Sequence, residues 1–312
     1  MKLSQKQEFY LGRYKGNSNA NDIALNNPSL GIEIDYLNNS LTDEERILRF
    51  FNNSQLNNIN VNSFLSFLKN PDDFLKNKKL VIGDVNGMID MVENLIDISC
   101  SAYLEYECPK KLYRYEYSEL VKDYDKNVLN CFKSSSVSKA VVETVFKGNG
   151  ELVELIINDG CFFIPVDKLI HSNTNIDPSD ENEFLFPPFL DCRREGNKIE
   201  VFFSSNEMDY NSYDVLVGSG KDDYEEAIKV FNKEIKHALV SHNISDDLKK
   251  ACNMIYQHLY YYARSKYMSY QRMKEEQKES ISQTDLDIVT QINDLLIEQE
   301  SMLQEEGPSH KL

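Results

Sequence analysis

Two glutamates, Glu181 and Glu183, stand two residues apart at the start of an expected strand, 183–189. Residues i and i+2 of a strand face the same side, so we expect both carboxylates on one face of a sheet. Like charge disfavours ionisation of both groups, and such a pair can divide its work, one carboxylate stabilising a cation while the other acts as a base. The alternative, which an isolated Glu-x-Glu favours, is an acidic, solvated strand edge.

A run of three serines, Ser134-Ser135-Ser136, ends another expected strand and leads into an expected helix over 136–146. Hydroxyl side chains satisfy the free N–H groups of a helix start, so Ser136 is a suitable N-cap residue. Taken alone, the segment is a well-capped strand-to-helix turn and nothing more.

An arginine, Arg114, lies inside the short aromatic strand expected at 111–115. A buried guanidinium needs an anion partner, and a diphosphate is one candidate. The alternative is a surface arginine beside a structural carboxylate, and the strand alone favours that alternative.

Together and in this order, the three segments resemble the R-S-E class of mono-ADP-ribosyltransferases. The serine segment of that family is an aromatic residue, one further residue and Ser-Thr-Ser, followed by a helix that opens with a pair such as Lys-Ala; the stretch 132–140 is similar. The glutamate segment of the family is Glu-x-Glu, then aliphatic residues and one or two prolines, which the stretch 181–188 resembles. The resemblance covers about residues 85–205. Two positions depart from it: Ser135 replaces the usual Thr, and Tyr115 stands where Gly often follows the arginine.

The resemblance implies an enzyme that breaks the nicotinamide–ribose bond of NAD+, a co-substrate, with no metal. Positive charge develops on the ribose ring during this reaction, and a carboxylate close to the ring lowers the barrier. Glu183 would hold the ribose 2′-hydroxyl and stabilise the cation, Ser134 would position Glu183, and Glu181 would orient or deprotonate the acceptor. In the family a glutamate at the position of Glu181 goes with arginine acceptors, so the expected partner is a protein with an accessible arginine.

The resemblance also implies the NAD+-binding residues. Arg114 would hold the phosphate and ribose region, and the backbone of Tyr115 would meet the nicotinamide amide. Ser134, Ser136 and Glu183 would complete the pocket, Ser136 on its nicotinamide side.

Periodicity predicts an α+β fold with segregated helices and strands. We expect a loop and helical region over 1–84, a catalytic core over 85–209 and a C-terminal helical region over 210–312. The expected helices include 86–100, 222–240, 245–279 and 284–305, and the expected strands include 111–115, 151–158, 161–166, 183–189 and 198–204. The resemblance implies that the core is a split β-sandwich.

The composition indicates which kinds of partner and which cellular compartment to expect. The formal net charge is -17 and no basic stripe is visible, so we expect no nucleic acid. No apolar run is long enough to span a bilayer, and the N-terminus has no apolar signal region, so we expect no membrane partner. The six cysteines form no CxxC pair, which predicts free thiols and no zinc site. A cytoplasmic location, or secretion into a host cell without a cleavable N-terminal signal, is the expectation.

Three alternatives stay open. The first is an NAD+ glycohydrolase on the same fold, with water as the acceptor. The second is a binding module that has lost catalysis, and the third is a helical interaction protein. The tyrosine-rich stretch 256–267 would be the docking segment of such an interaction protein. The favoured interpretation is a helix that packs on the catalytic core. The glutamate-rich end, 298–306, resembles the termini of some type IV secreted bacterial effectors, the alternative being a solvated helix end.

Overall fold

The computed structural model describes residues 1–12, 14–15, 61–72, 85–117, 124, 127–145, 150–173, 182–204, 221–241 and 243–305. The chain divides into two compact units, Met1–Met268 and Ser269–Leu312. The boundaries expected at 84/85 and 209/210 stay predictions. All six cysteines are free thiols, as predicted.

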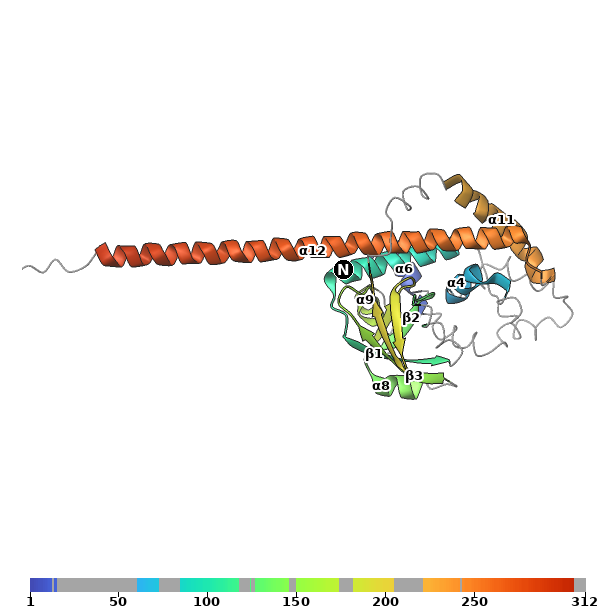
Figure 1. Ribbon diagram of the computed structural model, residues 1–312, viewed down its shortest axis with the longest axis horizontal. Helices are drawn as coiled ribbons and strands as arrows, with labels where there is room; N and C mark the ends of the chain where they lie inside the picture. The colour runs from blue at the N-terminus through green and yellow to red at the C-terminus, as the bar shows by residue number, and fades with distance from the viewer. Residues whose placement is uncertain are drawn as a thin grey trace, which may run out of the picture. The chain divides into compact units, whose positions relative to one another are not determined.

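The helices precede, interrupt and follow a strand-rich block, which confirms the α+β class (Figure 1). Residues 5–12 and 14–15 are helical near the N-terminus. The labelled helices are α4 (Val61–Lys69), α6 (Val85–Glu105), α8 (Lys139–Val145), α9 (Val166–Asn173), α11 (Lys221–Ser241) and α12 (Asp246–Glu305).

Within the described residues, seven strands form one open sheet in the order β4-β5-β2-β1-β3-β7-β6. They are β1 (Lys111–Tyr117), β2 (Lys133–Ser136), β3 (Gly150–Ile157), β4 (Ile164–Pro165), β5 (Glu183–Phe186), β6 (Asp191–Glu195) and β7 (Lys198–Phe202). All pairings are antiparallel except that of β3 with β7. Strand β3 pairs with both β1 and β7 and so joins the described strands into one continuous sheet.

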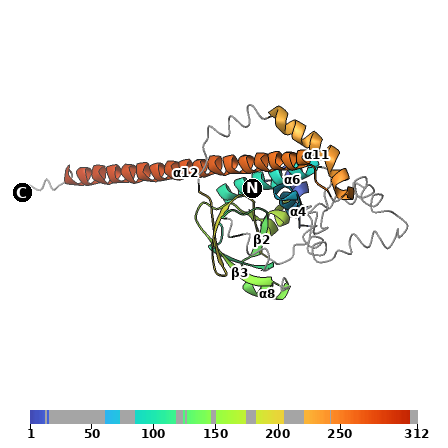
Figure 2. The ribbon, with the colours of Figure 1, turned by 45° about the vertical axis from the view of Figure 1, so that its right-hand side comes forward.

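Helix α6 anchors the core because it is apolar on most of its circumference. Twelve of its residues are buried, among them Met88, Val92 and Leu95. It lies against β4, α4 and α11. Figure 2 shows α6 running beside the first half of α12, where the Tyr262 hydroxyl donates to Asp97 Oδ1 at 2.9 Å.

The first half of α12 packs on the core, which confirms the favoured interpretation of the tyrosine-rich stretch. Tyr267 is buried, stacks on Phe162 at 4.5 Å between ring centroids, and donates its hydroxyl to the Pro188 carbonyl at 2.8 Å. Arg264, also buried, places Nη1 within 3.0 Å of both carboxylate oxygens of Asp191. These contacts hold the helix against the chain that leaves β5.

Several expected elements differ from the structure. The two helices expected at 245–279 and 284–305 are one sixty-residue helix, α12, since no Gly or Pro separates them. The strand expected at 161–166 is reduced to Ile164–Pro165, and the chain turns at once into α9. The sequence did not predict strand β6, which forms a hairpin with β7 across a turn at Gly196, whose φ is 61°.

Candidate active site

The serine segment and the glutamate segment meet as neighbouring antiparallel strands. In the register of β2 and β5, Ser136 lies opposite Glu183 and Ser134 lies opposite Leu185. Ser134 and Ser136 share a face of β2, so Ser134 is a diagonal neighbour of Glu183. The Ser134 hydroxyl donates to Glu183 Oε1 at 2.6 Å. Residues 49 positions apart are thereby joined by a short, charge-assisted hydrogen bond.

The Glu183 carboxylate is buried, and two residues near the N-terminus contact it. The Tyr14 hydroxyl donates to Oε1 at 3.1 Å, and Lys15 Nζ donates to Oε2 at 2.8 Å. Glu183 is only 5% exposed, so it depends on these donors and on Ser134 in place of water. Burial, followed by the nearby Glu183 charge, raises the pKa of Tyr14 well above its usual value. Tyr14 therefore remains a protonated donor at neutral pH.

A second carboxylate, Asp167, stands beside Glu183 at the start of α9. Asp167 Oδ2 accepts the backbone N–H of Glu183 at 2.7 Å, and Asp167 Oδ1 lies 3.4 Å from Lys15 Nζ. The ammonium of Lys15 thus lies between two carboxylates.

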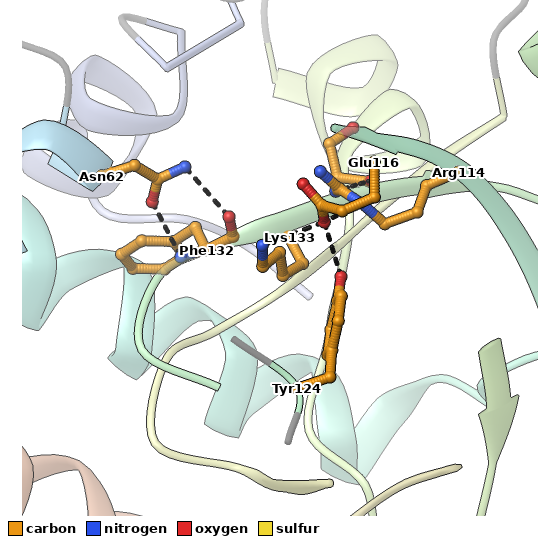
Figure 3. Close-up of polar contacts among 7 residues, drawn as sticks. Asn62, Arg114, Glu116, Tyr124, Phe132 and Lys133 are labelled. Atoms are coloured by element: carbon orange, nitrogen blue, oxygen red, sulfur yellow. Dashed lines mark hydrogen bonds and ion pairs between the residues drawn. The ribbon is translucent and has the colours of Figure 1, made fainter. Parts of the chain in front are cut away.

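Arg114 takes part in a buried ionic network, drawn in Figure 3, with Glu116, Tyr124 and Lys133. Arg114 Nε lies 2.9 Å from Glu116 Oε2, although its N–H is not aligned for a hydrogen bond. Lys133 Nζ and the Tyr124 hydroxyl donate to the same oxygen at 3.0 and 2.7 Å. Arg114 Nη1 also donates to the Ser134 carbonyl at 2.5 Å, which links the network to the strand that carries the serines.

The two cations of this network stabilise the charge on Glu116. Burial opposes its ionisation, but Arg114, Lys133 and the Tyr124 hydroxyl outweigh burial and lower the pKa of Glu116 from 4.5 to about 2. Burial also disfavours the charge of Arg114, yet Glu116 raises the pKa of that guanidinium. All three charged groups are therefore ionised at neutral pH.

Asn62 of α4 fixes the chain just before β2. Its amide nitrogen donates to the Phe132 carbonyl at 3.0 Å, and its Oδ1 accepts the Phe132 N–H at 2.8 Å (Figure 3). One side chain thus satisfies both backbone groups of the aromatic residue that opens the serine segment. The sequence did not predict this contact, because Asn62 and Phe132 are 70 residues apart and nothing near Asn62 points to its partner.

The structure brings together four of the predicted site residues, Ser134, Ser136, Glu183 and Arg114. Arg114 lies beside a structural carboxylate, Glu116, as the alternative interpretation of this arginine expected. Its side chain is 17% exposed. Glu181 lies outside the described residues. Tyr115 is half-buried on β1.

Ser136 does not cap the helix that follows it, and that prediction is wrong. Ser136 is the last residue of β2, paired with Glu183, and its hydroxyl accepts the Ser138 N–H at 3.0 Å. The helix begins at Lys139, and Ser138 caps it by accepting the Val141 N–H at 3.3 Å. Ser136 is buried, so its side chain belongs to the interior beside Glu183.

Sequence reasoning also missed Tyr14, Lys15 and Asp167. Tyr14 and Lys15 lie in a polar N-terminal stretch without a recognisable motif, and their partner is more than 160 residues away. Asp167 offered one signal, since it follows Pro165 by two residues, and a carboxylate suits the first turn of a helix.

Further features of the described residues bear on the class of protein. They hold no group of three or more His, Cys, Asp or Glu side chains arranged to bind a metal. Across the same part of the chain, no helix is both long and apolar enough to cross a membrane. Comparisons of the chain with protein-family models, curated proteins and solved structures gave no match.

Proposed function

We propose that this chain is a mono-ADP-ribosyltransferase that transfers ADP-ribose from NAD+ to an arginine of a target protein and releases nicotinamide. The observation that carries the proposal is the 2.6 Å hydrogen bond from Ser134 to Glu183. Together and in order, the serine and glutamate segments resemble the R-S-E pattern, and that resemblance implies that Ser134 positions Glu183. The hydrogen bond between the two side chains supports this role.

The electrostatics of the site support cleavage of a glycosidic bond. Glu183, Asp167 and Lys15 place two carboxylates around one ammonium in a largely buried setting. An oxocarbenium-like ribose is most stabilised by a fixed carboxylate that needs no reorganisation as the charge develops. Hydrogen bonds from Ser134 and Tyr14 fix Glu183 in one orientation, so it meets this condition.

The arginine acceptor is proposed from Glu181. A guanidinium stays protonated near neutral pH and needs a base or an orienting partner before it can attack. A glutamate two residues before Glu183 supplies such a group. If water is the acceptor instead, the protein is an NAD+ glycohydrolase, which the same assay separates by counting released nicotinamide against protein-bound ADP-ribose.

The proposal assigns Arg114 chiefly to the support of β2. Its guanidinium is held by Glu116 and by the Ser134 carbonyl. Two cations surround one carboxylate in that network, and the excess positive charge provides attraction for a phosphate group of NAD+. We further propose that the sheet bends at β3 into the two layers of a split β-sandwich. We also propose that the protein is delivered as a bacterial effector or toxin and acts inside a host cell.

The test is incubation of the purified protein with NAD+ labelled in the adenylate part, together with a host lysate. We expect label on proteins, released by reagents that cleave ADP-ribosyl-arginine, and at least about 100-fold less label with Glu183→Gln. Glu200→Gln on β7 is the matched control and should label like wild type. Equal labelling by wild type and Glu183→Gln would refute the proposal, and label only at non-arginine sites would refute its acceptor.

A further inference from the structure

The helical stretch near the N-terminus is fixed to the core along its length. It begins at a reciprocal cap, in which Ser4 Oγ accepts the Gln7 N–H and Gln7 Oε1 accepts the Ser4 N–H. Leu3, Tyr10 and Leu11 are buried. Lys6 pairs with Asp90 of α6 at 3.0 Å. These contacts make residues 1–15 an integral part of the first unit.

The end of this stretch delivers Tyr14 and Lys15 to opposite oxygens of Glu183. A carboxylate oxygen accepts about two hydrogen bonds. Among the described residues, Ser134 and Tyr14 fill both acceptor positions of Oε1, whereas Lys15 fills one position of Oε2. Both oxygens of the Glu183 carboxylate are therefore held by donors from two separate parts of the chain.

Lys15 also reduces the repulsion between two neighbouring carboxylates, those of Glu183 and Asp167. The backbone N–H of Glu183 is tied to Asp167 Oδ2, so a second carboxylate is held next to Glu183. The Lys15 side chain is only 10% exposed and lies 2.8 Å from Glu183 Oε2 and 3.4 Å from Asp167 Oδ1. Without this ammonium, two buried carboxylates would repel one another and Glu183 would lose its fixed orientation. Among the described residues, the Arg114 charge also acts on Tyr14, the second donor to Glu183 from this stretch.

We infer that Lys15, together with Tyr14, is a positioning residue of the active site: it holds Glu183 between Ser134 and Asp167 so that the carboxylate meets the ribose in one fixed orientation. This inference rests on the proposed function. It adds two residues near the N-terminus to a catalytic core that the resemblance places at about residues 85–205.

The experiment compares NAD+ cleavage by Lys15→Met, Lys15→Arg and Lys6→Met in the full-length chain. Lys6→Met is the matched control, because it removes an ion pair of the same stretch far from Glu183. We expect Lys15→Met to lower kcat about 10–100-fold while KM for NAD+ changes less than about 3-fold. Lys15→Arg keeps the positive charge and should retain about ten times the kcat of Lys15→Met, and Lys6→Met should match wild type.

The inference is overturned if Lys15→Met cleaves NAD+ as fast as wild type. It is also overturned if Lys15→Met is faster, since the stretch would then be inhibitory, or if Lys15→Arg is as impaired as Lys15→Met. Should Lys15→Met fail to fold, Tyr14→Phe decides the matter: it removes one donor to Oε1 and should lower kcat about 2–10-fold, and an unchanged kcat would contradict us.

Failure of the proposed function is distinguishable from failure of the inference. If wild type and Glu183→Gln both leave NAD+ intact, the function is wrong, and a crystal structure of Lys15→Met then decides the positioning claim. A Glu183 side chain that has turned away from Ser134 supports the claim, whereas an unmoved side chain overturns it.

Discussion

Replacing Glu116 with Gln should destabilise the first unit by about 3–5 kcal/mol, because it leaves two buried cations without their carboxylate. The magnitude follows from the ionic network of β1 and β2. Arg114 and Lys133 lie 2.9 and 3.0 Å from Glu116 Oε2, and the Glu116 side chain is 1% exposed. A pKa lowered from 4.5 to about 2 corresponds to about 3 kcal/mol of folding free energy.

The sign of the pH dependence follows from the same pKa. A depressed carboxyl pKa contributes stability that is complete above pH 4.5 and is lost as the pH falls toward about 2. Wild type and Glu116→Gln should therefore differ most at neutral pH. Their difference should shrink by about 3 kcal/mol as the pH is lowered through this window.

The assay is urea unfolding followed by circular dichroism, at neutral pH and at steps down to about pH 2.5. The partly exposed Glu200→Gln serves as control and should cost less than about 1 kcal/mol. Glu116→Gln combined with Lys133→Met should recover part of the loss, since one unopposed cation is then removed. A cost below about 1 kcal/mol for Glu116→Gln, or a difference from wild type that does not change with pH, would refute the reasoning.

Three further predictions concern the contacts around the site. Ser134→Ala removes one donor to Glu183, so NAD+ cleavage should fall about 10-fold or more while thermal unfolding moves little; unchanged cleavage would contradict the role of Ser134. Arg264→Met leaves the buried Asp191 without its partner and should cost about 3–5 kcal/mol in urea unfolding, and a loss below about 1 kcal/mol would show that the pair does not hold α12. Asn62→Ala frees two backbone groups before β2 and should cost about 1–3 kcal/mol, detected as faster amide exchange at the start of β2; exchange at the wild-type rate would count against it.

The contact of Ser134 with Glu183 agrees with what the resemblance to the R-S-E family implied, namely that Ser134 positions Glu183. Alternation within one strand places only Ser134 and Ser136 on one face; it does not predict that β2 pairs with β5. The α+β class and the packing of the tyrosine-rich stretch of α12 followed from periodicity, which needs only the pattern within each element.

The remaining features depend on contacts between distant segments. Lys15 and Asp167 meet at Glu183 only because the N-terminal stretch docks on α6, and nothing near either residue encodes that docking. Glu116 lies two residues after Arg114 on β1, so alternation alone could have pointed to this partner, but Tyr124 and Lys133 join the network from outside β1. The division of α12 into two helices was wrong because a polar stretch without Gly or Pro does not end a helix.

The central claim is that Glu183 drives cleavage of the nicotinamide–ribose bond. The most direct measurement is the rate of nicotinamide release from NAD+ by the purified chain, compared with Glu183→Gln at matched folded concentration. We predict release by wild type and a rate at least about 100-fold lower for the folded fraction of Glu183→Gln. Release at the same rate from both proteins, or from neither, would contradict the account.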